Sequence, residues 1–334
     1  MIAHTTRVHP LAATLARVTA TNTYLSTQYG EPTEADWYRP AALYTASSAA
    51  LAAQIAKAHE RLRTTTPIVV AGSLLQGYQW PLIHAAVACY LADRRVPEVQ
   101  PDDVWLHHKH GAEHADEIDA LALTSTRFYT LPDDPDAATP TRRSCPTGSP
   151  AQRPARYDRR SLRPAVALLC AELGCKERAL WLFVADGLAG TMAWLLQEQQ
   201  PALSLAQLDV ELAGLVRVPN SPLYTTQIGL FTLTYREQLH VQYDRATCCY
   251  WYKTADANGD CCTTCPKRPT AERDALLLKD IAEQYKARLQ GEAVAHGNAH
   301  MHERPMTRGT RSPVRTVRVS RCEPPAGWNA VFQS

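Results

Sequence analysis

Five of the ten cysteines in this 334-residue chain fall within eighteen residues. The run opens with the adjacent pair Cys248 and Cys249, continues through a turn-rich spacer, and closes with Cys261, Cys262 and Cys265 before a proline. Apolar packing gives no reason to concentrate sulfur in this way, whereas thiolate ligation of iron or zinc does. The fold must therefore bring two short sulfur-bearing segments together.

The remainder of the composition indicates a cytoplasmic protein. The N-terminus has no basic segment followed by an apolar one, so no secretory signal is expected. Residues 64–92 are the longest uncharged stretch, but they contain glutamines, a proline and a histidine, so no transmembrane segment is expected. A formal net charge of +2 gives no support for a nucleic-acid partner. In a reducing cytoplasm, clustered cysteines indicate metal ligands rather than disulfides.

The residue pattern predicts an α+β fold that is largely helical, with an antiparallel sheet whose C-terminal hairpin leads into the cysteine motif. Residues 1–131 form the expected N-terminal, mainly helical part. Apolar residues at helical spacing predict helices over 41–63 and over 74–93, the second broken or beginning near Pro81. Extended segments are expected from residue 102 and over 120–131.

Residues 132–160 hold six prolines and few aliphatic side chains, so they are interpreted as a linker or loop. The C-terminal part, 161–269, begins with three expected helices, which cover 162–173, 179–196 and 204–216.

The hydrophobic period then changes to that of strands. A hairpin is expected from strands at 224–235 and 239–243, turning near Arg236 and Glu237 and running straight into Cys248. Residues 270–334 are expected to form an amphipathic helix over 270–290 followed by a basic, flexible tail.

The cysteine spacing favours an iron–sulfur cluster over zinc. Structural zinc sites usually combine two C-x-x-C knuckles, and only the second half of this motif is one. Adjacent cysteines project in different directions along an extended chain, which suits two metal atoms better than one. We interpret Cys248, Cys249, Cys262 and Cys265 as the ligands, with Cys261 as a spare or alternative ligand; a zinc site and uncoordinated thiols remain the alternatives.

The run from Arg245 through Cys248-Cys249 to Cys262-Thr-Thr-Cys265-Pro266 resembles the C-terminal motif of the ferric siderophore reductase family (FhuF type). Looser similarity extends over residues 44–269. The chain departs from the family pattern in a spacer of twelve residues rather than about ten, in the additional Cys261, and in its 65 residues after Pro269.

This resemblance implies a cytoplasmic oxidoreductase whose [2Fe–2S] cluster passes one electron to a ferric siderophore, as part of iron transport. An electron donor such as a ferredoxin or a flavin reductase is then an implied partner. Arg245, Lys253, Lys267 and Arg268 lie close to the cysteines and are candidates for docking the substrate or the donor. The rival hypotheses are a zinc-stabilised interaction module and a [2Fe–2S] electron-transfer or redox-sensing protein without a siderophore substrate.

Three weaker features stand outside the motif. His107, His108, His110, Glu113 and His114 form a histidine-dense segment that is more typical of a surface than of a metal site. Asp186, in an uncharged stretch, is a candidate substrate contact or helix cap. Cys89, Cys170 and Cys175 have apolar neighbours in the sequence and are interpreted as core residues.

Overall fold

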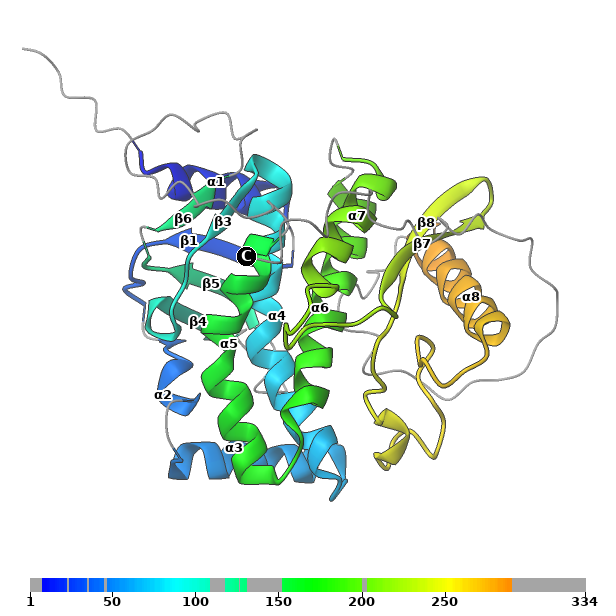
Figure 1. Ribbon diagram of the computed structural model, residues 1–334, viewed down its shortest axis with the longest axis horizontal. Coiled ribbons are helices and arrows are strands. Elements are labelled where there is room, and N and C mark those ends of the chain that lie inside the picture. The colour runs from blue at the N-terminus through cyan, green and yellow to red at the C-terminus, as the bar shows by residue number, and fades with distance from the viewer. Residues whose placement is uncertain are drawn as a thin grey trace, which may run out of the picture.

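Helix α4 (Pro67–Asp93) is the centre of the fold (Figure 1). The computed structural model describes residues 8–22, 24–34, 36–44, 47–108, 118–125, 127–130, 152–199 and 203–289. Buried side chains occur all around α4, which packs against α6 (Glu177–Gln199), α5 (Gln152–Leu173), α1 (Pro10–Thr21) and α3 (Ala49–Leu62). This enclosure explains its unusually apolar sequence, because a helix that is hydrophobic all round must be buried.

A four-stranded sheet covers one side of these helices, in the order β1-β5-β4-β2. Its strands are β1 (Ser26–Tyr29), β5 (Ile118–Leu123), β4 (Val104–His108) and β2 (Trp37–Tyr38). Strands β4 and β5 pair antiparallel, but β1 and β5 pair parallel, with Ser26 opposite Ala120. The expected antiparallel sheet is therefore mixed, and it belongs to the part of the chain expected to be mainly helical. A second, two-stranded pair joins β3 (Arg95–Pro97) to β6 (Phe128–Thr130).

The C-terminal part adds the β7–β8 hairpin and two helices. Strand β7 (Gly229–Tyr235) pairs with β8 (Gln238–Asp244), and α7 (Leu205–Val216) packs against β7. Arg236 and Glu237 both have positive φ, 48° and 65°, as a two-residue hairpin turn of type I′ requires. The predicted turn is confirmed, whereas β7 begins at Gly229, five residues later than expected.

Two hydrophobic clusters hold these layers together. The main core runs from Leu11 in α1 through α4, α5 and α6 to Cys249, so residues on both sides of the expected linker share one core. A smaller cluster joins Phe231 and Leu233 of β7 to Leu277 and Ile281 of α8 (Thr270–Leu289). The predicted amphipathic helix is thus confirmed, and it packs against strand β7 of the hairpin.

Three predicted helix boundaries differ from the observed ones. The segment 41–63 contains two helices, α2 (Ala41–Tyr44) and α3, with Ser48 capping α3 by accepting a hydrogen bond from the Leu51 amide. Helix α4 passes through Pro81 unbroken, because the burial of most of its side chains, Pro81 among them, outweighs the ~3 kcal/mol that an interior proline costs. Helix α5 begins at Gln152, inside the expected linker; residues 131–151 and 290–334 lie outside the described residues.

Candidate metal centre

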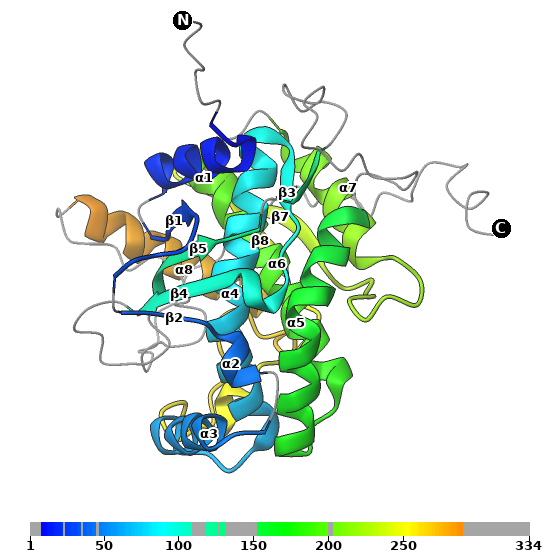
Figure 2. The same cartoon turned by 90° about the vertical axis from the view of Figure 1, so that its left-hand side faces the viewer.

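The loop that carries the cysteines starts where the hairpin ends. Strand β8 ends at Asp244, Arg245 follows, and Cys248 comes three residues later. The loop continues through a short 3₁₀ helix at Trp251–Lys253 to Cys265, and then meets α8. Figure 2 shows this yellow loop at the same end of the molecule as α3, and an ion pair between Arg63 and Asp256 joins the two.

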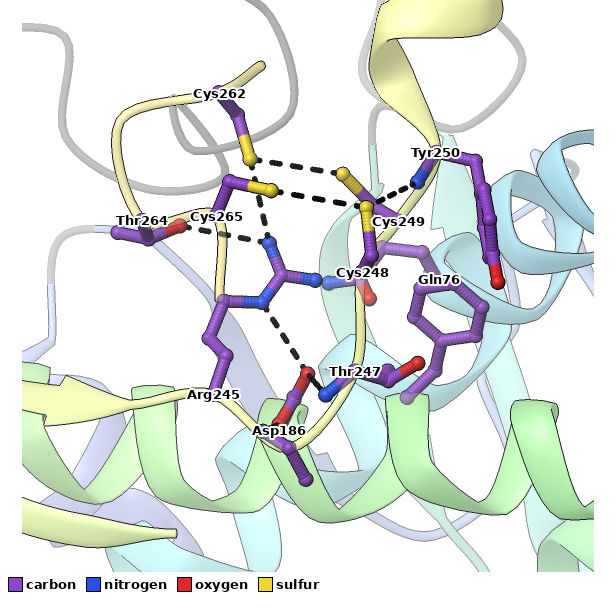
Figure 3. Close-up of polar contacts among 12 residues, drawn as sticks. Gln76, Asp186, Arg245, Thr247, Cys248, Cys249, Tyr250, Cys262, Thr264 and Cys265 are labelled. Carbon is purple, nitrogen blue, oxygen red and sulfur yellow. Dashed lines mark hydrogen bonds and ion pairs between the residues drawn. The ribbon is translucent and has the colours of Figure 1, made fainter. Parts of the chain in front are cut away.

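Asp186 of α6 fixes the entry to the loop. Its Oδ1 accepts a hydrogen bond from the Ala246 amide at 2.6 Å, and its Oδ2 accepts from the Thr247 amide at 3.2 Å. The same Oδ2 accepts from Nε of Arg245 at 3.2 Å (Figure 3). Both charged side chains are 5% exposed. Asp186 lies in the middle of α6 and is therefore not a helix cap; it anchors the segment that precedes Cys248.

Burial raises the pKa of Asp186 to about 6, against the lowering effect of Arg245 and the two amides. Burial also works against the charge of Arg245, but the Asp186 carboxylate keeps the pKa of Arg245 well above its ordinary value. The pair is therefore ionised at neutral pH, and a fixed positive charge lies beneath the cysteine loop.

The four predicted ligands lie together, with two close sulfur pairs (Figure 3) and a further thiol contact between Cys262 and Cys265 that links the pairs. Sγ of Cys248 is 3.7 Å from Sγ of Cys265, and Sγ of Cys249 is 3.7 Å from Sγ of Cys262. Two thiolates that bind one tetrahedral metal at ~2.3 Å stand about 3.8 Å apart. Each pair therefore has the separation of two ligands on one metal. Across the described residues, no group of three or more His, Cys, Asp or Glu side chains is placed so that it could hold a metal ion.

Hydrogen-bond donors point at the sulfurs of both pairs, including the Trp251 amide at Cys249 and the Lys267 amide at Cys265. The Tyr250 amide donates to Sγ of Cys248 at 3.3 Å, in a turn where Tyr250 has a positive φ of 56°. Nη1 of Arg245 lies 3.8 Å from Sγ of Cys262 and donates to Oγ1 of Thr264 at 3.4 Å. Donors aimed at sulfur stabilise negative charge there, which favours thiolate ligands and raises the reduction potential of a bound cluster.

The cysteines shift one another's pKa values both within the pairs and between them. A hydrogen bond from Cys262 lowers the pKa of Cys249 to about 6, and one from Cys262 also lowers the pKa of Cys265 to about 5. Burial raises the pKa of Cys248 to about 12, and the hydrogen bond to Cys249 raises that of Cys262. Because cysteine ligands bind a metal as thiolates, metal binding at this site would release protons.

Cys261 lies at the edge of the four sulfurs, where its thiol hydrogen-bonds with the Cys265 thiol. Its side chain is only partly buried, and its carbonyl oxygen accepts a hydrogen bond from Nη2 of Arg268. Nε of Arg268 donates to the Cys262 carbonyl at 3.1 Å, and its Nη1 pairs with Glu272 of α8. Arg268 thus holds the C-x-x-C segment onto α8 instead of projecting freely as a docking residue.

The four expected docking residues separate into two classes. Arg245 is 7% exposed and cannot meet a partner, so its role, like that of Arg268, is to support the loop. Lys253 and Lys267 are exposed. Nζ of Lys267 donates to the Tyr252 hydroxyl at 2.8 Å and lies 4.5 Å from the centroid of that ring. Both lysines also face the Tyr250 ring, at 5.6 Å and 5.2 Å. We call these four side chains the lysine–tyrosine surface.

A small, mostly apolar pocket adjoins the loop at Cys249 and Trp251. It is lined by Cys249 and Trp251 from the loop, by Leu62 of α3, by Val69, Gly72 and Ser73 of α4, and by Phe183 of α6. The cysteine site is therefore flanked by a cationic surface next to Cys248 and by an apolar hollow next to Cys249.

The histidine-dense segment is only partly described. His107 Nδ1 lies 2.7 Å from Oδ1 of Asp119, and the His108 ring stacks on Tyr38 with centroids 4.6 Å apart. Both residues thus have structural contacts within the sheet region, while His110, Glu113 and His114 lie outside the described residues.

Comparison with protein-family models and with curated protein sequences gives no match. Among the described helices, α6 is long and apolar enough to cross a membrane, but 67% of its apolar window is buried inside the fold, as in a core helix.

Proposed function

We propose that this protein is a cytoplasmic ferric-siderophore reductase with a [2Fe–2S] cluster held by Cys248, Cys249, Cys262 and Cys265. The observation that carries the proposal is the arrangement of the four sulfurs in two pairs, each 3.7 Å apart. Cys248 and Cys265 would hold one iron, and Cys249 and Cys262 the other. A single zinc ion would instead draw all four sulfurs around one centre.

The chemistry follows from how siderophores hold iron. Their hard oxygen donors bind Fe³⁺ tightly and bind the softer, less charged Fe²⁺ far more weakly. A bound cluster would supply the one electron that converts Fe³⁺ into Fe²⁺. No bond of the siderophore then needs to be broken for the metal to leave.

The residues around the site have supporting roles in this proposal. Arg245 is buried and charged, and it lies against Cys262, so it favours the extra negative charge of a reduced site. The lysine–tyrosine surface offers positive charge and ring faces to an anionic chelate or to an acidic electron donor. Cys249 also lines a small, mostly apolar pocket together with Trp251 and Phe183, so the site borders apolar side chains as well as the lysine–tyrosine surface.

A reduction assay tests the proposal. Protein purified without oxygen is reduced chemically, freed of reductant and mixed with a ferric siderophore, and Fe²⁺ is trapped with a ferrous-specific chelator. We expect oxidation of the protein to be accelerated by the siderophore, with one Fe²⁺ trapped per electron lost. Oxidation no faster than in a siderophore-free blank would contradict reductase activity and favour a redox-sensing role.

Two neighbouring cysteines provide a matched pair of variants. Cys262→Ser removes a proposed ligand and should abolish Fe²⁺ release, whereas Cys261→Ser should retain it. The opposite outcome, with Cys261 required and Cys262 dispensable, would overturn the ligand assignment.

A further inference from the structure

A second pair of thiols lies away from the cysteine loop, at the corner between α5 and α6. Helix α5 ends at Leu173, Gly174 follows with a positive φ of 65°, and α6 begins at Glu177. Across this corner Sγ of Cys175 lies 3.1 Å from Sγ of Cys170, and both thiols are free. No partner atom lies within 4 Å of the position that a Cβ on Gly174 would take, so the glycine serves the backbone conformation alone.

The helix end accounts for why the two side chains meet. A left-handed glycine just after a helix turns the chain back, and the residue after it commonly packs against the last turn. Any small apolar pair would provide that contact, but here both positions are cysteine. The sulfur atoms of a disulfide stand about 2.05 Å apart. The observed separation would therefore have to shorten by roughly 1 Å, which side-chain movement can supply because the backbone turn already brings the two residues together.

The two thiols also differ in access. Cys170 is 9% exposed, whereas Cys175 is partly exposed and stands beside the exposed Lys176. A small disulfide in solution can therefore reach Cys175 first. Cys170 is then in position to attack the mixed disulfide that forms on Cys175. One exposed thiol that attacks and one buried thiol that resolves the mixed disulfide are typical of thiol pairs that exchange with small disulfides.

We propose that Cys170 and Cys175 are a reversible dithiol–disulfide site that exchanges with low-molecular-weight disulfides such as glutathione disulfide. The Cys175 thiolate attacks one sulfur of that disulfide, forming a mixed disulfide and releasing one glutathione thiolate. Cys170 then attacks Sγ of Cys175, its proton passes to the departing sulfur, and the second glutathione leaves as a thiol. Two protein thiols are oxidised to one disulfide, and one glutathione disulfide is reduced to two thiols.

The site is separate from the proposed cluster but is tied to the same helix. Oxidation would join the last turn of α5 to the residues that begin α6, and α6 carries Asp186, the anchor of the cysteine loop. Neither thiol belongs to the four sulfurs proposed as ligands. The disulfide can therefore form whether or not a cluster is bound.

Differential alkylation with peptide mapping tests the site on the full-length protein purified without oxygen. The protein is equilibrated with mixtures of reduced and oxidised glutathione, alkylated, and digested so that the peptide with residues 170–175 is separate from the peptide with residues 248–265. We expect the first peptide to lose alkylation at both cysteines together and to become lighter by two hydrogens, reversibly. Buried Cys89 is the internal reference that should show no glutathione-dependent change.

Single variants distinguish exchange from simple burial. In Cys170→Ser the mixed disulfide cannot be resolved, so a glutathione adduct should accumulate on Cys175; in Cys175→Ser no adduct should form on Cys170. Full alkylation of both wild-type cysteines at every glutathione ratio would overturn the proposal, as would a stable adduct on wild-type Cys175. Because the 248–265 peptide is followed separately, failure of the cluster proposal would be seen independently.

Discussion

Oδ2 of Asp186 lies 3.2 Å from Nε of Arg245, and both side chains are buried where helix α6 meets the end of the β7–β8 hairpin. The same carboxylate holds the amides of Ala246 and Thr247, so one helical residue fixes three consecutive loop residues. This contact converts the hairpin and the helix into a rigid base for the cysteines, as a metal site with defined ligand geometry requires.

Removing one partner of this buried pair should destabilise the protein strongly. For Asp186→Asn we expect the free energy of unfolding to fall by about 3 to 5 kcal/mol, because Arg245 is left as a buried, unpaired charge. Urea unfolding measures the change. The double variant Asp186→Leu, Arg245→Met should recover much of the loss, since it removes both charges. A loss below about 0.5 kcal/mol in Asp186→Asn, the size of an ordinary surface change, would contradict the anchoring role.

The lysine–tyrosine surface should control the rate with anionic partners. We expect Lys253→Glu, Lys267→Glu to slow reduction of a negatively charged ferric chelate about tenfold at low ionic strength, with the difference fading as salt screens the charges. Stopped-flow oxidation of the reduced protein measures it. The double variant Lys279→Glu, Lys286→Glu makes the same change in net charge on α8, is the matched control and should leave the rate unchanged. Equal effects at both sites would show that only net charge matters.

His84 should make the fold sensitive to acid. Its ring is fully buried between Trp80 and Trp194, hydrogen-bonds to Asn22, and burial lowers its pKa to about 3. The unfolded chain binds a proton near pH 6.5 that the folded chain binds only near pH 3, so stability is complete above pH 6.5 and is lost as the pH falls.

Between about pH 6.5 and pH 3, protonation of His84 in the unfolded chain should lower the free energy of unfolding by about 1.4 kcal/mol per pH unit. Urea unfolding of wild type and His84→Gln at pH 7 and pH 5 isolates it, because the other titrating groups are common to both. We expect the stability gap between the two proteins to narrow by about 2 kcal/mol at the lower pH. A gap that stays constant would show that the folded protein already accommodates a charged His84.

Gly190 should be important for the packing of the hairpin against α6, because its missing side chain leaves room for Tyr243. A Cβ added there would lie 3.0 Å from Cζ and Oη of Tyr243 in β8. Alanine gains ~1 kcal/mol over glycine in a helix, but overpacking costs about 1 to 3 kcal/mol, so Gly190→Ala should be net destabilising. In a Tyr243→Leu background the same change should instead stabilise. An equal effect of Gly190→Ala in both backgrounds would exclude the ring contact as the cause.

Local pattern predicted much of this architecture. Periodicity located α6, α7 and α8, and the change to strand spacing located the hairpin turn at Arg236 and Glu237. The four clustered cysteines were predicted from spacing and resemblance, and the structure brings their sulfurs together.

The features that were missed depend on contacts between distant residues. Strand β1 has only four residues and pairs in parallel with β5, some ninety positions later, a pairing that leaves no local signal. The course of α4 through Pro81 is decided by the helices around it. A single carboxylate in an apolar stretch marked Asp186 as unusual, but only the fold shows that it meets Arg245.

Metal and sulfide analysis of anaerobically purified protein tests the central proposal most directly, with electron paramagnetic resonance after one-electron reduction. The account predicts two iron atoms and two acid-labile sulfides per chain, and a paramagnetic signal on reduction. The signal should be lost in serine variants of Cys248, Cys249, Cys262 and Cys265 and kept in Cys261→Ser. A colourless protein with one zinc per chain and no labile sulfide would contradict it.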